Sequence, residues 1–281
     1  MGSRSIWRGS ISFGLVNIPI KLFSTTEDTD FSFNQLDEKG HRIQYKKWCP
    51  IEEREVKYSE IKKGYEISKD NYVLIEKEDL DKIKVKTTKT IDIKEFIDSK
   101  DFDPIFIEKS YYLVPDESSG SKRSGKSNSI TGASKAYYLF INAIKETKKI
   151  AIGKVVLKDR EHLVALRPYQ KGMVMHQLRY QEEIKPVDEV EGMSGSSPDK
   201  KPILDKKEIS LGKMLVENLS NKEFDPSQYH DSFTEQLEKI VAAKSQGKTY
   251  HVKIEETEDV GDNLMEALKA SIQTSNGKTS K

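Results

Sequence analysis

Apolar and polar residues alternate through the run from residue 5 to 23. The apolar positions are odd-numbered from Ile11 to Leu15 and even-numbered from Val16 to Leu22. Alternation with a period of two predicts a β-strand, because successive side chains leave opposite faces of the pleat. The apolar set changes face where the phase changes. The pattern therefore predicts a bulge or a bend beside Gly14, as part of a β-barrel.

Further segments rich in aromatic and β-branched residues predict short strands up to about residue 178. They lie at 31–33, 43–45, 72–75, 90–93, 111–114, 150–157, 163–166 and 173–178. Helical periodicity appears at 78–83 and at 136–148, where apolar residues from Tyr137 to Ile144 share one face. A β-rich chain with one or two inserted helices is typical of a barrel, not of alternating strands and helices. We therefore predict a mainly β fold with α additions.

The pattern changes after Arg179. The range 187–207 is rich in acids, Gly, Ser and Pro, which predicts an extended connection. Two amphipathic helices are expected next, with apolar stripes that include Leu211, Met214, Leu215 and Leu219 in the first and Phe233, Leu237 and Ile240 in the second. Ser232 and Glu235 have the spacing of a capping box. The stripes can pack on their own barrel or on a second chain, and the sequence leaves both open.

Composition limits the class of protein. Of the 281 residues, 33% are charged and 35% hydrophobic, and the net charge is +1. No apolar run resembles a signal peptide or approaches the ~18 residues of a membrane span. A single cysteine, Cys49, fits a reducing cytoplasm. Because the net charge is so small, any nucleic-acid site must be a local concentration of basic residues that acids offset elsewhere.

One motif points to an enzyme. Residues 120–127 match GxxxxGK[ST], in which backbone N–H groups wrap a phosphate between a strand and a helix. Here the predicted strand ends near Val114, and Gly132 makes a helix directly after the motif improbable. The segment also has the Ser, Gly and Lys bias in which such a pattern arises by chance. The five histidines show no metal-ligand or catalytic spacing. We therefore expect no enzyme activity, no cofactor and no metal.

Basic residues alternate with aromatic ones between His41 and Tyr65. The basic residues that we select as candidates for DNA binding are Arg42, Lys46, Lys47, Arg54, Lys57, Lys62 and Lys63, together with Lys21 in the barrel. Arg160, Arg167 and Arg179 are further barrel candidates. Four glutamates within the segment dilute its charge, so a solvated hairpin is the alternative.

Six segments resemble one family. They are SIWRGSISFGLVNIPIKLFSTTE at the start, KGYEISKDNYVLIEKEDL, DPIFIEKSYYLVPD, KAYYLFINAIKETKKIAIGKVVLKDREHLVALRP, LRYQEEI and FDPSQYHD. In this order they resemble the prokaryotic Ku family, the DNA-end-binding proteins of non-homologous end joining. The resemblance covers nearly the whole chain up to about Gly247.

The resemblance implies a domain plan. It places a Ku-type β-barrel core at 1–186, with a long β-bridge at about 27–70 and a Ser/Gly/Lys insertion at 117–134. A helical dimerisation arm follows at 187–252, and a short tail at 253–281. Two bridges of a homodimer would close a ring around duplex DNA ends without regard to sequence. Many relatives carry a CxxC pair where this chain has Cys49 and Glu52, so no zinc knuckle is expected.

The resemblance also implies partners. The tail is the expected contact with the end-joining DNA ligase, which is ATP-dependent, through Leu264, Met265 and Leu268. The expected location is cytoplasmic and nucleoid-associated, with no membrane partner. Two rival functions stay open from the residues alone. One is a P-loop nucleotide hydrolase that uses 120–127, and the other is a β-barrel interaction module without DNA.

Overall fold

The computed structural model describes most of the barrel region and two later helices. The described residues are 4–27, 31–83, 89–119, 132–190, 193, 205–221 and 223–248. The chain divides into two compact units, of which the first holds residues 1–29 and 34–189 and the second holds 30–33 and 190–281. The motif at 120–127 and the tail residues Leu264, Met265 and Leu268 lie outside the described residues.

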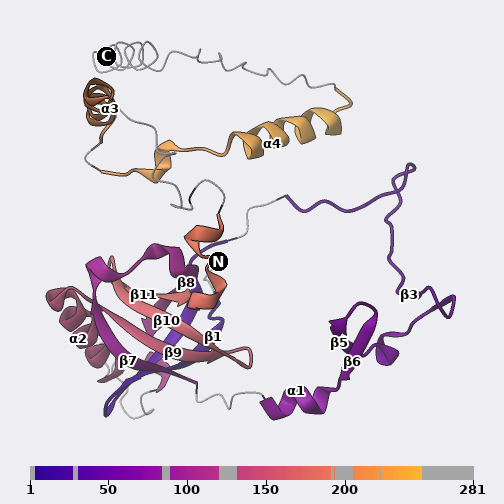
Figure 1. The fold of residues 1–281 in the computed structure, drawn as a ribbon, viewed down its shortest axis with the longest axis horizontal. Coiled ribbons are helices and arrows are strands. Elements are labelled where there is room, and N and C mark those ends of the chain that lie inside the picture. The colour runs from indigo at the N-terminus through magenta and orange to yellow at the C-terminus, as the bar shows by residue number, and fades with distance from the viewer. Residues whose placement is uncertain are drawn as a thin grey trace. The chain divides into compact units, whose positions relative to one another are not determined.

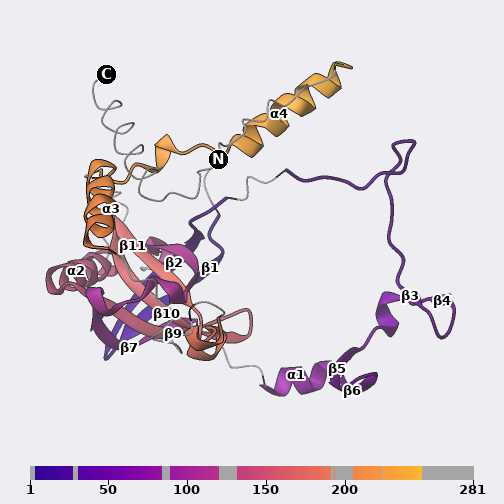
Figure 2. The same ribbon diagram turned by 45° about the horizontal axis from the view of Figure 1, so that its top comes forward.

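A closed barrel of seven strands forms the core of the first unit (Figures 1 and 2). The strands are β1 (Trp7–Phe13), β2 (Val16–Ser24), β7 (Thr90–Asp98), β8 (Ile107–Pro115), β9 (Lys149–Leu157), β10 (Arg160–Tyr169) and β11 (Gly172–Leu178). Their order around the barrel is β1-β2-β8-β11-β10-β9-β7. Parallel pairing of β1 with β7 closes the ring, whereas all the other neighbours are antiparallel. The predicted mainly β barrel with helical additions is confirmed.

The change of phase near Gly14 is a hairpin turn, so the predicted bulge or bend was wrong. β1 and β2 pair antiparallel, with Ile11 opposite Ile18 and Phe13 opposite Val16. Opposite partners in this register pair an odd position with an even one, and opposite residues share a face of the sheet. The apolar positions must therefore change from odd to even residue numbers across the turn. Gly14 has a φ of +57°, and glycine at the first central position is the preference of a two-residue type II′ turn.

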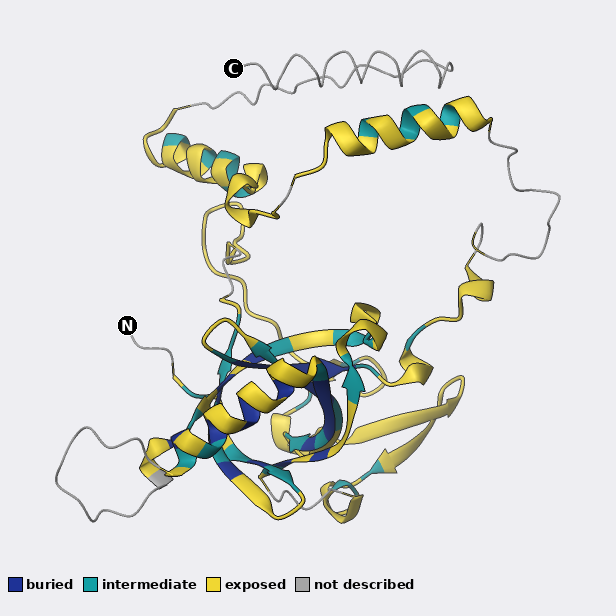
Figure 3. Cartoon of the chain, turned by 90° about the vertical axis from the view of Figure 1, so that its left-hand side faces the viewer, coloured by how far each residue is buried: buried dark blue, intermediate teal, exposed yellow. Residues whose placement is uncertain are grey.

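Helix α2 (Gly132–Thr147) lies across the ring of strands and supplies part of the barrel core (Figure 3). Its face from Tyr137 to Ile144 is buried against barrel residues such as Ile11 and Met175, which confirms the predicted apolar face. Burying each such side chain stabilises the fold by roughly 1.5–3 kcal/mol. The hydroxyl of Tyr137 donates a hydrogen bond to the carbonyl oxygen of Leu113 at 2.5 Å. Helix and barrel thus share one core.

A smaller apolar cluster covers the outer side of the β9–β10–β11 sheet. Ile150, Ala165 and Leu178 are buried there beneath Phe102 and Phe106. The two phenylalanines belong to a connection with the short 3-10 helices η2 (Ser99–Asp101) and η3 (Pro104–Phe106). These strands are therefore buried on both faces, which explains why their sequence is nearly continuously apolar.

Between β2 and β7 the chain forms a long insertion. Its elements are β3 (Trp48–Cys49), β4 (Arg54–Glu55), η1 (Tyr58–Glu60), β5 (Lys63–Ser68), β6 (Asn71–Ile75) and α1 (Lys77–Ile83). The helical turns predicted at 78–83 are confirmed by α1. Strands predicted at 31–33 and 43–45 are absent from the structure, which shows only an isolated bridge between Leu36 and Arg42 nearby. These short aromatic runs have no extended partner strand to complete a ladder.

The second unit contains helices α3 (Lys206–Asn218) and α4 (Ser232–Ser245). Asp205 caps α3 in a capping box with Glu208. The N-cap of α4 is Asp231, not the expected Ser232, and its carboxylate accepts hydrogen bonds from the backbone N–H groups of Phe233 and Thr234. Further short 3-10 helices in the described part of the chain are η4 (Glu117–Ser119), η5 (Gln181–Glu183) and η6 (Val187–Glu189) in the first unit and η8 (Pro226–Gln228) in the second.

Candidate nucleic-acid interface

Two small antiparallel hairpins carry most of the predicted basic residues. In the first hairpin Trp48 is opposite Glu55, and Cys49 is opposite Arg54. The second pairs β5 with β6, around a turn in which Asp70 has a φ of +60°. Figure 2 shows this second hairpin directly before α1 in the chain. Each hairpin has only two strands, and a two-stranded sheet is marginally stable alone in water.

Nothing from residue 34 to 83 is buried. Every residue of this insertion segment is exposed except four that are half-buried, namely Cys49, Val56, Ile75 and Leu80. Its exposed side chains include many large apolar and aromatic ones. Among them are Tyr45, Trp48, Ile51, Tyr58, Tyr65, Ile67, Tyr72 and Leu74, each more than half exposed. Contiguous exposed apolar surface marks interaction sites, and this segment supplies many side chains from which such a surface can be formed.

Two of the predicted basic side chains are engaged by acids of their own segment. The ammonium of Lys46 lies 3.0 Å from Glu55. Arg54 pairs with Glu60 at 2.6 Å and with Glu52 at 2.5 Å. Hydrogen bonds from Arg54 to these two carboxylates raise the pKa of Arg54 above its ordinary value. Such exposed pairs contribute little to stability, but they offset the local positive charge.

Other predicted cations of the segment have neutral partners or no ion pair. Lys47 lies over the ring of Tyr58, 4.6 Å from its centroid, as a cation–π pair. Arg42 donates a hydrogen bond to the side-chain oxygen of Asn34 at 2.8 Å. Lys57, Lys62 and Lys63 make no ion pair with any residue that the structure describes. Among the basic residues selected from the sequence in this segment, these three lysines are therefore the ones whose charge is least compensated.

Lys21 lies apart from this group. It is in β2 of the barrel, and its ammonium is 2.9 Å from the carboxylate of Asp116. The hydroxyl of Ser118 donates to the same carboxylate oxygen, and together with Lys21 it lowers the pKa of Asp116 to about 2. The structure thus assigns Lys21 an ion-pair partner within the barrel, and its predicted contact with DNA stays a prediction.

The sequence does not show that the residues of β6 lie on this exposed surface. The short strand predicted at 72–75 is confirmed as β6, which belongs to the exposed second hairpin and not to the barrel. Tyr72 is 55% exposed and Leu74 is 66% exposed, so β6 is open to solvent. Apolar residues follow one another here without alternation. Such a run does not distinguish a strand that is buried on both faces from a strand that is exposed on both faces.

The predicted dimerisation residues lie on helices without a buried side chain. Met214, Leu219 and Phe233 are exposed, at 47%, 63% and 71%. Leu211, Leu215, Leu237 and Ile240 are less exposed, but none of them is buried. A helix with an apolar stripe is stabilised mainly when that stripe packs against something else. Their role in a dimer stays a prediction.

The described residues give no support to a disulfide, a metal site or a membrane-spanning helix. Cys49 is a free, half-buried thiol. No group of three or more histidine, cysteine or acidic side chains is placed to hold a metal ion in the part of the chain that the structure describes. Among the helices described, none is long and apolar enough to cross a membrane.

Comparison with known proteins identifies the family. The family model of the Ku70/Ku80 beta-barrel domain matches residues 12–211. The chain is 42% identical to the non-homologous end joining protein Ku of Heliobacterium modesticaldum, over 96% of this chain and 91% of the relative. Proteins of the same name from Desulfitobacterium hafniense and Archaeoglobus fulgidus are 39% and 37% identical, over 98% and 96% of this chain and 89% and 98% of their own lengths. The chain therefore belongs to the Ku family of non-homologous end joining proteins.

Proposed function

We propose that this protein binds the ends of double-stranded DNA, without regard to sequence, as a ring-shaped homodimer. In this role it serves the repair of double-strand breaks by non-homologous end joining. It acts by binding and recruitment, without catalysis of its own, and it brings an ATP-dependent DNA ligase to the break. The proposed location is the cytoplasm, in association with the nucleoid.

One observation carries the proposal. The insertion segment from residue 34 to 83 buries no side chain, although it forms two β-hairpins and exposes several aromatic residues. Ordering a chain costs roughly 1–2 kcal/mol per residue, which buried surface normally offsets. A segment that buries so little gains the missing contacts from a partner. Lysines without a carboxylate partner, here Lys57, Lys62 and Lys63, suit the phosphates of DNA.

Contact through phosphates also suits the task. Phosphate contacts position a protein on DNA but carry no sequence information. A break can occur in any sequence, so an end-binding protein has to use contacts of this kind. The net charge of +1 is compatible with such binding because a closed ring prevents sideways escape even when each contact is weak.

A ring made from one kind of chain requires a second copy. The apolar stripes of α3 and α4 have no buried member, and Phe233 is 71% exposed. We assign these stripes to the dimer contact, which a two-fold axis would use twice. The tail residues Leu264, Met265 and Leu268 are assigned to the ligase.

A gel-shift experiment with linear and closed circular duplex of one sequence tests the function. A ring that loads at ends binds the linear form and leaves the circle unbound, at equal DNA mass and moderate salt. Equal binding of the two forms would point to an open basic surface instead. Cutting the circle once, at a blunt site, should restore binding.

A further inference from the structure

A basic cavity lies on the barrel, apart from the insertion segment. It has a volume of about 650 Å³ and is formed by the second half of α2, the start of β9, the end of β10 and the turn after it. The cationic side chains that line it are Lys145, Lys148, Lys149, Arg167 and Lys171. None of the described residues that line the cavity is acidic. Its size is within the range of small-molecule sites.

Arg167 is held in this cavity by a neutral partner. Its Nε–H donates a hydrogen bond to Nε2 of His176 at 2.9 Å. His176 is buried, and burial together with the charge of Arg167 lowers its pKa to about 4. The imidazole is therefore neutral at pH 7, with its proton on Nδ1, which lies 2.8 Å from the hydroxyl oxygen of Ser110. On the other side, the guanidinium lies 5.6 Å from the ring centroid of Tyr169.

This arrangement leaves the charge of Arg167 uncompensated. The residue is half-buried and has no carboxylate within ion-pair distance among the described residues. Its Nε–H is engaged by the imidazole, and its terminal nitrogens make no hydrogen bond with another described residue. A partly buried cation without a counter-ion is unfavourable. The two terminal nitrogens of the guanidinium form a planar fork of N–H donors. This fork fits a ligand with two acceptor oxygens, such as a phosphate group.

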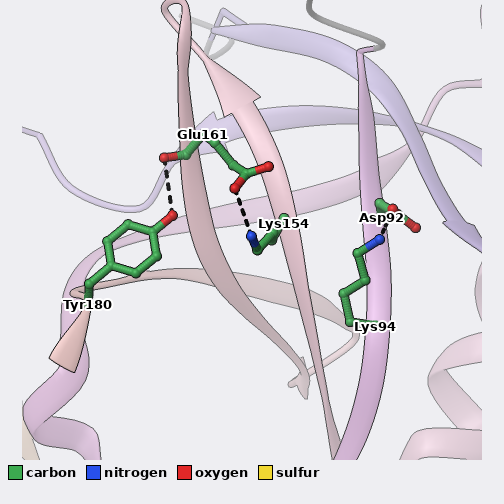
Figure 4. Close-up of polar contacts among 5 residues, drawn as sticks. All are labelled: Asp92, Lys94, Lys154, Glu161 and Tyr180. Carbon is green, nitrogen blue, oxygen red and sulfur yellow. Dashed lines mark hydrogen bonds and ion pairs between the residues drawn. The ribbon is translucent and has the colours of Figure 1, made fainter. Parts of the chain in front are cut away.

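Two lysines elsewhere on the barrel differ in this respect. Lys154 pairs with Glu161 at 2.8 Å, and Lys94 pairs with Asp92 (Figure 4). Of the cations that line the cavity, Lys149 has an acidic partner among the described residues, Asp98, at 2.9 Å. Placement at the C-terminal end of α2 explains why Lys145 is favourable there. It does not explain Arg167 or Lys171, which come from β10 and the turn after it.

We infer that the cavity around Arg167 is a binding site for a phosphate group, which Arg167 holds through its terminal nitrogens and the surrounding lysines attract. The group can belong to the DNA that the protein binds or to a free phosphorylated molecule. If the phosphate belongs to DNA, the inference rests on the proposed function. It then adds a DNA contact on the barrel to the DNA contacts of the insertion segment. Tyr138 and Tyr169 also line the cavity and offer it aromatic surface.

Calorimetric titration of the full-length protein with inorganic pyrophosphate tests the inference, at low salt in a phosphate-free buffer. We expect saturable binding to the unaltered protein and a loss of at least tenfold in affinity for Arg167→Gln. Because Arg167 is half-buried, a second variant, Lys145→Gln with Lys171→Gln, alters only exposed side chains. It should also weaken binding severalfold. No saturable binding to the unaltered protein, or equal binding by all variants, would overturn the inference.

A charge-matched control and a DNA titration complete the design. Lys94→Gln with Lys154→Gln removes the same charge from carboxylate-paired positions and should leave pyrophosphate binding unchanged. An equal loss in this control would mean that overall charge accounts for the binding, and the inference would fail. If the cavity variants also bind linear duplex more weakly than the control does, the phosphate is that of DNA. If only pyrophosphate binding is weakened, the ligand is a free phosphorylated molecule. A protein that prefers linear DNA but does not bind pyrophosphate would keep the proposed function and exclude this site.

Discussion

Lys21 and Asp116 form an ion pair on the barrel, with 2.9 Å between the ammonium and the carboxylate oxygen. The pair joins β2 to the residue that follows β8, next to the place where the two strands pair. Only 22% of the Lys21 side chain and 11% of the Asp116 side chain are exposed. Lys21 therefore contributes to the barrel whether or not it also contacts DNA.

Replacing Lys21 by Gln should lower the free energy of unfolding by roughly 1–3 kcal/mol, because a partly buried carboxylate is left without its charged partner. Urea denaturation at pH 7 measures the change. The double variant with Asp116→Asn should be less destabilised than the sum of the two single variants. Strict additivity would contradict a direct interaction between the two side chains.

Lys57, Lys62 and Lys63, which make no ion pair with a described residue, should contribute strongly to the contacts of the insertion segment with DNA. Changing Lys57, Lys62 and Lys63 together to Gln should weaken binding of a linear duplex. It should also reduce the dependence of log affinity on log salt by roughly 0.9 for each phosphate that a lysine no longer neutralises. Fluorescence anisotropy at several salt concentrations measures both quantities. Lys46→Gln should have a smaller effect, because Glu55 already offsets its charge.

The control for this experiment is Lys94→Gln with Lys154→Gln, which removes paired lysines from the barrel surface. We expect its salt dependence to equal that of the unaltered protein. A triple variant that behaves like this control would show that the insertion segment is not the DNA-binding surface.

The buried histidine predicts a pH dependence of stability. The folded-state pKa of His176 is lowered to about 4 from an ordinary 6.5. The unfolded chain therefore binds the proton first as the pH falls, and stability present above pH 6.5 is lost on the way to pH 4. The loss between pH 7 and pH 5 should be roughly 2 kcal/mol. Urea midpoints at these two values measure it, and His176→Gln should flatten the difference. An unchanged pH profile in that variant would contradict a buried, neutral imidazole.

The helix stripes predict the assembly state. Phe233→Ala with Leu237→Asp should convert the proposed dimer to a monomer, because a charge would enter the contact and an aromatic anchor would be removed. Sedimentation velocity measures the mass. Glu238→Gln lies on the same helix outside the stripe and should leave the dimer intact. A dimer that persists in the double variant would place the contact elsewhere.

Substitutions in the tail test the proposed ligase contact independently of DNA binding. Leu264→Asp with Leu268→Asp should abolish stimulation of the end-joining ligase while the protein still binds linear duplex. End-joining assays with purified ligase, alongside gel shifts, measure the two activities. Ligation that is stimulated as before would exclude these leucines from the ligase contact.

The spacing of apolar residues predicted the barrel and much of its strand content, but not which strands pair. The apolar face of α2 from Tyr137 to Ile144 followed directly from helical spacing, and it is buried as expected. The phase change at Gly14 was visible too, yet a bulge and a two-residue turn reverse the alternation in the same way. Only the pairing of Ile11 with Ile18 distinguishes them. Pairing is a long-range property that no short window of sequence contains.

The candidate surface was predictable in composition and not in geometry. The basic and aromatic residues from His41 to Tyr65 could be identified from the sequence, but their partners could not. Lys46 and Lys57 have the same charge, and only the structure shows that Glu55 engages the first. Arg167 illustrates the same limit. Its environment depends on His176, which lies on the neighbouring strand, and on lysines that come from other elements.

Encirclement of DNA by the proposed homodimer is tested most directly by retention of the protein on end-blocked DNA. The protein is loaded on a linear duplex, bulky groups are then attached to both ends, and the salt concentration is raised until phosphate contacts no longer hold. A ring predicts that the protein stays on the blocked duplex and leaves an otherwise identical duplex with open ends. Equal dissociation from both would contradict encirclement.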